Sequence, residues 1–165
     1  MNIFYFHSNP SICAKWLCDV HVVSQVKETA QILCTVTNER DQFKSVDGLW
    51  KSTHKNHPSV RWAGDSVSNF TWTCVLFADL LEEYHHRFSK QHGSTHLIEP
   101  LTSVLSSLKT DGKQGTLPPA CVSDRIKKME LPVTFAYRLY YNEKKQTMKR
   151  PMVWTNRTKP EWMVG

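Results

Sequence analysis

Residues 19–38, DVHVVSQVKETAQILCTVTN, constrain the fold more than any other part of the chain, because apolar side chains recur there at helical spacing. Steps of three and four residues place such side chains on one face of an α-helix. This face comprises Val22, Val23, Val26, Ala30, Leu33 and Thr37. We therefore predict a long amphipathic helix whose apolar face packs against the core.

The same helix carries a second, polar face. A step of seven residues returns almost to the same direction, so His21 and Glu28 are expected to point the same way, with Gln25 between them and Lys27 beside Glu28. A carboxylate, an imidazole and an amide on one face suit the floor of an active site. A solvated polar face is also the ordinary property of a surface helix, and the spacing leaves both interpretations open.

A second long helix is predicted over residues 67–90, where aromatic and aliphatic side chains also follow the helical period. Shorter helices are expected from Pro10, after His57-Pro58 with Ser59 helping to begin the helix, over 97–108 and 123–129, and from Pro132. Residues 3–6 are predicted as a strand fragment or an extended arm. Residues 39–56 and 111–119 are predicted as loops.

The length of 165 residues and the hydrophobic share of 40% suffice for one core. We therefore expect an all-α (mainly α) fold, a compact single-domain helical bundle over residues 1–165. Long basic loops and an irregular C-terminal tail after Arg150 complete this prediction.

A formal net charge of +6 and a pI near 9.1 favour an anionic partner, because a basic surface concentrates polyanions. The excess is greatest from Arg125 onward, where ten Lys or Arg residues stand against three acidic residues. The aromatic residues interleaved with them are Tyr137, Tyr140, Tyr141, Trp154 and Trp162. This mixture is typical of surfaces that contact a phosphate backbone and stack on bases.

The five cysteines are scattered, and none forms a close pair of the kind found in zinc sites or redox motifs. This pattern favours reduced thiols in a cytoplasmic protein. The first residues lack the features of a signal peptide, and no stretch approaches the apolar length of about 18 residues that spans a membrane. We expect a monomer without membrane contact, cofactor or bound metal.

A basic segment, THKNHPSVRW at residues 53–62, contains His54, Lys55, His57 and Arg61 within eight positions. Four cations or hydrogen-bond donors so close together suit a phosphate-binding or catalytic loop. A basic surface loop with one structural histidine explains the same residues equally well. A metal site is disfavoured, because no carboxylate or cysteine accompanies the histidines at ligand spacing.

Three segments carry a resemblance to a known family, and they occur in a fixed order. They are DVHVVSQVKETAQIL, then HKNHPSVRW ahead of a long aromatic helix, and then a closing KPEW. Together they resemble the pyrimidine-dimer DNA glycosylase (endonuclease V-type) family of phages and bacteria. The resemblance is strongest over residues 17–33 and 53–88 and weak between 93 and 130. It implies an all-helical enzyme, for instance in a phage-infected bacterial host, that acts on double-stranded DNA. Such enzymes cut the N-glycosidic bond of a damaged pyrimidine and then nick the backbone.

By this resemblance Glu28 corresponds to the catalytic carboxylate and Lys27 to an arginine that contacts DNA. His21 corresponds to a histidine one repeat earlier on the same helix face, and the Pro160-Glu161-Trp162 tail would lie near the lesion. In the leading hypothesis His21 and Gln25 orient the sugar or the leaving base. The residues expected to bind substrate or DNA are Lys27, His54, Lys55, His57, Arg61, Arg150, Trp154, Arg157 and Trp162. Such basic and aromatic residues would suit the extraction of a damaged base from the stack.

One position departs from the family pattern. The family nucleophile is the amine of the second residue, exposed when the initiating methionine is removed, but Asn2 is too large for efficient removal. Three alternatives follow: the Met1 amine forms a Schiff base with the sugar, Glu28 directs a water without lyase chemistry, or the scaffold acts on another substrate.

The leading prediction is therefore a DNA base-excision N-glycosylase for a damaged or modified pyrimidine, with or without AP-lyase activity through the N-terminal amine. The catalytic residues would be Glu28, Met1, His21 and Gln25. One alternative is a phage accessory module that binds nucleic acid or protein without catalysis. The other is a glycosidic-bond enzyme acting on free nucleosides or nucleotides.

Overall fold

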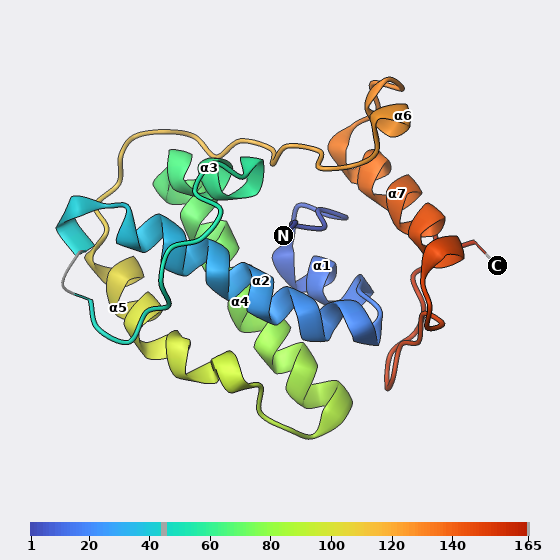
Figure 1. Cartoon of the computed structure of the whole chain (residues 1–165), viewed down its shortest axis with the longest axis horizontal. Helices are drawn as coiled ribbons and strands as arrows, with labels where there is room; N and C mark the ends of the chain where they lie inside the picture. Colours follow the sequence, from blue (N-terminus) through green and yellow to red (C-terminus); the bar gives the residue numbers. More distant parts are fainter. Residues whose placement is uncertain (44–45, 165) are drawn as a thin grey trace.

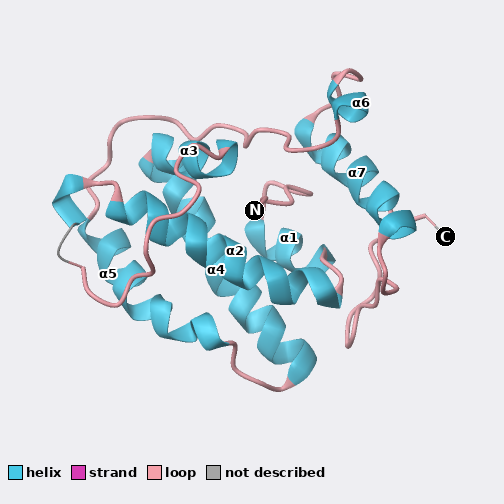
Figure 2. Cartoon of the chain, viewed as in Figure 1, coloured by secondary structure: helices cyan, strands magenta, loops and turns pink. Residues whose placement is uncertain are grey.

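The computed structural model describes residues 1–43 and 46–164, which are built from helices and loops (Figure 2). The helices are α1 (Pro10–Trp16), α2 (Asp19–Asn38), η1 (Asp41–Phe43), α3 (Pro58–Asp65), α4 (Val67–Phe88), η2 (Gly93–Leu97), α5 (Ile98–Ser107), α6 (Asp124–Lys127) and α7 (Val133–Thr147), where η marks a 3-10 helix. These ranges contain no strand, so the predicted all-α class is confirmed. The loop predicted over residues 39–56 includes η1, and its residues 44–45 lie outside the described part.

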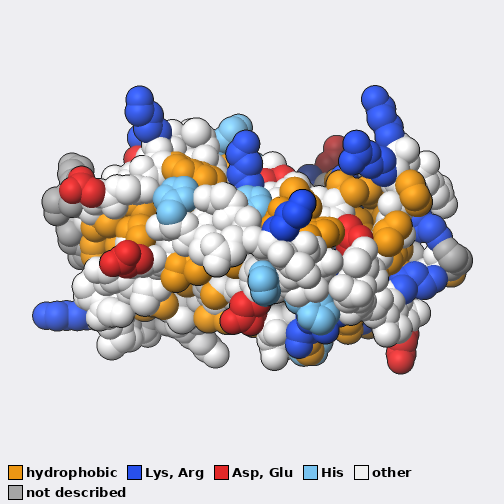
Figure 3. Space-filling model, turned by 90° about the horizontal axis from the view of Figure 1, so that it is seen from below, with side chains coloured by type: hydrophobic (Ala, Val, Ile, Leu, Met, Phe, Trp, Pro, Cys, Tyr) orange, Lys and Arg blue, Asp and Glu red, His pale blue; other side chains and the backbone are white. Residues whose placement is uncertain are grey.

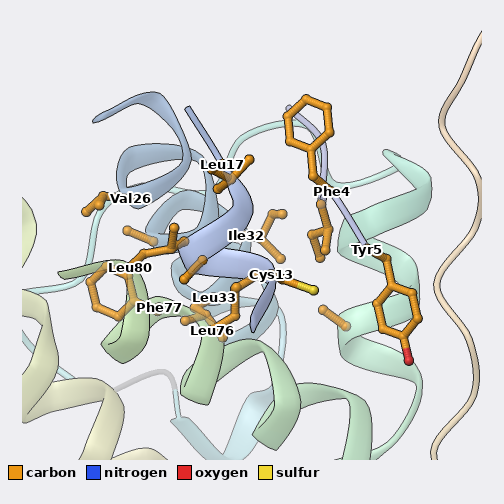
Figure 4. Close-up of a cluster of buried hydrophobic side chains, with 14 of the residues drawn as sticks. Phe4, Tyr5, Cys13, Leu17, Val26, Ile32, Leu33, Leu76, Phe77 and Leu80 are labelled. Carbon is orange, nitrogen blue, oxygen red and sulfur yellow. The ribbon is translucent and has the colours of Figure 1, made fainter. Parts of the chain in front are cut away.

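The two long helices α2 and α4 cross at the centre, and α1 and α3 pack beside them (Figure 1). Val26 and Leu33 of α2 meet Phe77 and Leu80 of α4 in one buried hydrophobic cluster (Figure 4). Burial of these side chains removes apolar surface from water, which is the main favourable term in folding. The apolar periodicity of both helices therefore defines the centre of the fold.

The prediction that Val23 belongs to the buried apolar face is wrong, because its side chain is 43% exposed. Neighbouring residues on an α-helix point about 100° apart. Val22 is fully buried against the core, which directs Val23 toward solvent. The buried face of α2 is therefore narrower than the sequence pattern suggested.

The segment at residues 3–6 is an extended arm rather than a strand fragment. Ile3 and Phe6 are fully buried, and the rings of Phe4 and Phe6 lie 5.3 and 4.9 Å from the ring of Tyr141 on α7. The arm thus occupies the space between α2 and α7 and leaves the N-terminus between them (Figure 1). Tyr137 and Tyr141 are fully buried beside it, so neither ring is available to stack on a nucleotide base, contrary to our expectation.

Two helix starts follow from local sequence. Asn9 caps α1, accepting a hydrogen bond from the Ser11 N–H at 2.9 Å, and Pro10 occupies the first turn as predicted. The start of α3 is a correction, because His57 rather than Ser59 provides the cap: its Nδ1 accepts from the Ser59 N–H at 3.2 Å. Pro58 disfavours helical geometry in the preceding residue, which leaves the His57 side chain in capping position.

The C-terminal tail contains no helix in residues 148–164, as predicted, and buried polar side chains hold it in place. Arg157 donates to Glu83 of α4 at 2.8 Å, and the Thr155 hydroxyl donates to Asp19 of α2 at 2.6 Å. Arg87, whose side chain is 0% exposed, bridges the two acids with distances of 2.6 Å to Glu83 and 2.9 Å to Asp19. We refer to Asp19, Glu83, Arg87 and Arg157 as the ion-pair cluster.

The long connection from α5 to α6 runs across the top of the molecule in Figure 1 and is pinned to α3 and α4. The Trp62 indole N–H donates to the Thr116 carbonyl at 3.1 Å, and the Thr116 N–H donates to the Asn69 side chain at 2.9 Å. These bonds satisfy backbone groups that a loop would otherwise leave to water. The connection then reaches Cys121 beside the N-terminus, where the Asn2 side chain donates to the Cys121 carbonyl at 3.0 Å.

Candidate functional site

A cavity of about 340 Å³ opens where α2, α7, the N-terminal arm and the start of α3 meet. Its lining comprises Met1, Asn2, Phe4, His21, Ser24, Gln25, Glu28, His57, Cys121, Tyr140 and Lys144. We call this space the Glu28 cavity. A concave site with several convergent polar groups is the usual form of a small-ligand site.

Glu28 lies in this cavity with 33% of its side chain exposed. Its hydrogen bonds and its ion pair all involve the same carboxylate oxygen, Oε2. Oε2 accepts from the Asn2 N–H at 2.9 Å and from Gln25 Nε2 at 3.0 Å, and it lies 3.6 Å from the amine nitrogen of Met1. No described residue donates a hydrogen bond to Oε1. One carboxylate oxygen is therefore fixed by the protein, and the other remains available to a bound molecule.

The N-terminus is held near Glu28 by the side chain of Asn2. The Asn2 Oδ1 accepts from the Tyr137 hydroxyl at 2.8 Å, and its Nδ2 donates to Cys121. Both ends of this amide are thus committed to structural partners from α7 and the loop before α6. The large side chain at position 2 thus fixes the backbone that carries the Met1 amine.

His21 lies at the other end of the polar face of α2 and is 9% exposed. Its Nδ1 lies 2.7 Å from the Tyr141 hydroxyl and 3.3 Å from the Cys18 sulfur. Burial, followed by the positive charge of Lys144, lowers the pKa of His21 to about 4. The imidazole is therefore neutral at neutral pH and is not a cation that binds phosphate.

The wall opposite α2 is formed by Tyr140 and Lys144, one turn apart on α7. The Lys144 ammonium lies 5.6 Å from the centroid of the Tyr140 ring, and Lys144 forms no ion pair with any described residue. A cation held over an aromatic ring retains its charge for a ligand. The cavity therefore presents a carboxylate on one wall and an unpaired ammonium on the other.

His57 completes the cavity from the start of α3. Burial is the main cause that lowers the pKa of His57, and the positive charges of the Met1 amine and His54 act in the same direction. Its Nδ1 is occupied by the cap of α3. Of the basic segment at residues 53–62, His57 alone lines the Glu28 cavity.

The structure thus brings together Met1, His21, Gln25 and Glu28 of the predicted catalytic residues, with His57. The other predicted DNA contacts of the first half of the chain lie elsewhere. Lys27 and His54 are exposed and do not line the cavity. Lys55 pairs with Glu39 at 2.8 Å, and Lys55 and Arg61 line a separate depression of about 350 Å³.

The predicted contacts in the tail are also outside the cavity. Arg150 is exposed, Trp154 donates its indole N–H to the Trp16 carbonyl at 3.1 Å, and Arg157 belongs to the ion-pair cluster. Trp162 lines a different cleft of about 660 Å³ beside Trp16. Trp162, which the resemblance places near the lesion, therefore does not line the Glu28 cavity.

Sequence reasoning missed Lys144, Phe4 and Cys121 as residues of the cavity. The spacing of Tyr140 and Lys144 shows that they share a face of α7, but the face turned toward α2 is set by the burial of Tyr137 and Tyr141. Cys121 comes from a loop with no periodic signal. No local pattern connects these residues with Glu28.

No protein-family model, no curated protein and no solved structure gives a significant match to this chain. Within residues 1–43 and 46–164, no group of three or more His, Cys, Asp or Glu side chains is arranged to hold a metal ion. None of the helices in the same ranges is both long and apolar enough to cross a bilayer.

Proposed function

We propose that the protein is a DNA base-excision N-glycosylase that acts on a damaged or modified pyrimidine in double-stranded DNA, with the Met1 amine as nucleophile. The observation that carries the proposal is the distance of 3.6 Å between this amine and Glu28 Oε2 inside the Glu28 cavity. A nucleophile and a carboxylate that serve one sugar must share one site. The resemblance found in the sequence implies a carboxylate at Glu28 paired with an N-terminal amine, which in the family belongs to the second residue and here would be that of Met1.

The chemistry follows from the two groups. The amine, in its neutral form, attacks the anomeric carbon of the sugar, and the glycosidic C–N bond breaks with its electron pair leaving on the base, which takes up a proton. Glu28 stabilises the positive charge that develops on the sugar. Opening of the sugar ring then gives an imine between the protein and the DNA.

The cavity size supports a substrate extracted from the duplex. A volume of about 340 Å³ lies at the lower end of the range for ligand pockets. Enzymes that act on a base in DNA commonly rotate the nucleotide out of the stack into such a pocket. On the face shown in Figure 3, Lys and Arg side chains are scattered rather than gathered in one patch. Specific binding is therefore expected to depend on the cavity more than on that face.

Reductive trapping tests the proposal directly. Sodium borohydride is expected to link the protein to duplexes that contain ultraviolet-damaged or oxidised pyrimidines, because it reduces the imine to a stable amine. Mass spectrometry should then locate the adduct on the peptide that begins at Met1. Acetylation of the N-terminal amine should abolish the adduct. Acetylation of Lys90, an exposed residue, is the control and should leave the adduct unchanged.

Two outcomes separate the alternatives. Base release without a trapped adduct would contradict the amine mechanism and support water directed by Glu28. Binding of duplex DNA without base release from any modified pyrimidine would contradict the glycosylase proposal and support a non-catalytic binding module.

Lys144 is expected to contact a phosphate next to the extracted nucleotide. Lys144→Met should weaken binding to a duplex with an abasic-site analogue and reduce the slope of log affinity against log salt concentration by about 1. Fluorescence anisotropy over a range of salt concentrations measures both. Lys145→Met is the matched control, because Lys145 follows it on α7 but donates to the Val164 carbonyl of the tail at 3.0 Å. Equal slopes for the two variants would contradict this role of Lys144.

A further inference from the structure

The hydrogen bonds around His21 define which of its ring nitrogens carries the proton. The Tyr141 hydroxyl accepts from the Cys18 N–H at 2.9 Å and lies 2.7 Å from His21 Nδ1. Its own proton can be donated to Nδ1 or to the Cys18 sulfur, and an imidazole nitrogen is a much stronger acceptor than a thiol. These contacts favour Nδ1 as the acceptor, which places the proton of the neutral ring on Nε2.

The surroundings keep the His21 ring neutral. Tyr141 and Lys144 face it from α7, and its other neighbours are Cys18, the N-cap residue of α2, and Gln25 on α2. Phe4 packs on it from the arm with ring centroids 5.2 Å apart. Glu28, the carboxylate of the cavity, lies two turns away along α2, next to the Met1 amine. Burial raises the pKa of both Cys18 and Tyr141, so neither becomes an anion that would favour imidazolium.

The Nε2 atom of His21 is free to donate a hydrogen bond to a molecule in the Glu28 cavity. No described residue forms a hydrogen bond with Nε2, although the His21 ring lines the Glu28 cavity. Seven residues separate His21 from Glu28, which corresponds to about 10 Å along the helix axis. A nucleoside with its sugar at Glu28 would extend its base toward His21. The atom opposite the glycosidic bond of a pyrimidine is carbon 4.

We propose that His21 is a specificity residue whose Nε2–H donates to the carbonyl oxygen on carbon 4 of the extracted pyrimidine. This inference rests on the proposed function and names its substrate class: uracil- or thymine-derived bases, which carry an oxygen at that position. Cytosine-derived bases carry an amino group there, and two donors would face each other. A site built around a hydrogen bond rejects an analogue that cannot make it.

Nuclear magnetic resonance tests the tautomer without reference to activity. Long-range ¹H–¹⁵N correlation spectra of the full-length protein, with His21 assigned by the signals lost in His21→Gln, should show the Nε2–H form of a neutral ring down to about pH 5. A proton on Nδ1, or imidazolium at neutral pH, would overturn the inference.

Matched substrates test the specificity. The bases 5-hydroxyuracil and 5-hydroxycytosine differ at carbon 4 and in the proton that uracil carries on nitrogen 3. Single-turnover base release from duplexes that contain them should favour 5-hydroxyuracil by about tenfold to a hundredfold. His21→Ala should reduce this ratio to near unity, and His21→Gln, which retains a donor, should keep part of it. His57→Ala is the control, because His57 lines the same cavity and should slow both substrates alike.

The outcomes distinguish this inference from the proposed function. Equal release of the two bases by the unaltered protein would overturn the specificity role and leave the glycosylase proposal intact. Release of neither base, nor of any other modified pyrimidine, would contradict the glycosylase proposal and the base-reading role together. The tautomer would still be decided by the spectra.

Discussion

Glu28→Gln is expected to reduce base release by a factor of about 10² to 10⁴, the range in which a positioned acid or base contributes to catalysis. The substitution removes the negative charge that stabilises the sugar cation in the proposed mechanism. It retains an oxygen that can accept the Asn2 N–H, which lies 2.9 Å from Oε2 in the unaltered protein. The fold should therefore be preserved. Single-turnover kinetics on a duplex with a modified pyrimidine measures the effect, and circular dichroism checks the helix content.

Glu82→Gln provides the control for this experiment, because Glu82 is an exposed carboxylate on α4 outside the cavity. It should behave like the unaltered protein. Affinity for an abasic-site analogue should change little in Glu28→Gln or increase, since one negative charge near the DNA is lost. A fully active Glu28→Gln protein would contradict the glycosylase proposal.

Arg87→Met should have the largest effect on stability. The Arg87 guanidinium, 0% exposed, donates to Glu83 and Asp19 and to the Lys15 carbonyl at 3.0 Å. Removing one partner of a buried ion pair leaves buried charge uncompensated and costs about 3 to 5 kcal/mol. The melting temperature should fall by roughly 6 to 20 °C for a chain of this size. Urea denaturation and thermal melting measure the two quantities.

The matched control is Lys90→Met, an exposed cation just after the end of α4 that should change stability little. Arg157→Met, which removes the more exposed arginine of the cluster, should cost less than Arg87→Met because solvent reaches its side chain, 29% of which is exposed. An Arg87→Met protein as stable as the Lys90→Met protein would contradict the stabilising role of Arg87 in the ion-pair cluster.

The same cluster predicts a dependence of stability on pH. Burial alone would raise the pKa of Glu83, but hydrogen bonds from Arg157 and Arg87 outweigh it and hold the pKa below its ordinary value. A lowered folded-state pKa stabilises the protein fully above the unfolded value, which is about 4.3. This contribution is lost as the pH falls from there through the folded pKa. The difference in free energy of unfolding between the unaltered protein and Arg87→Met should therefore narrow as the pH falls below about 4.3, as measured by urea denaturation at each pH.

The sequence determined the helical fold and the locations of the long helices, because periodicity is a local property of each helix. Val22, Val26 and Leu33 are buried where their spacing predicted. The same rule failed at Val23 since the width of a buried face depends on what packs against it. The polar face of α2 was also visible locally, but burial of His21 and Gln25 within it was not.

Only the tertiary structure decided which residues surround Glu28. Local periodicity shows which side chains share a face of one helix, whereas long-range packing selects the face that meets another element. The buried arm at residues 3–6 brings Met1 within 3.6 Å of Glu28, and the burial of Tyr141 turns Lys144 toward the same cavity. The packing of arm against helix, and not a motif, therefore assembled the candidate site.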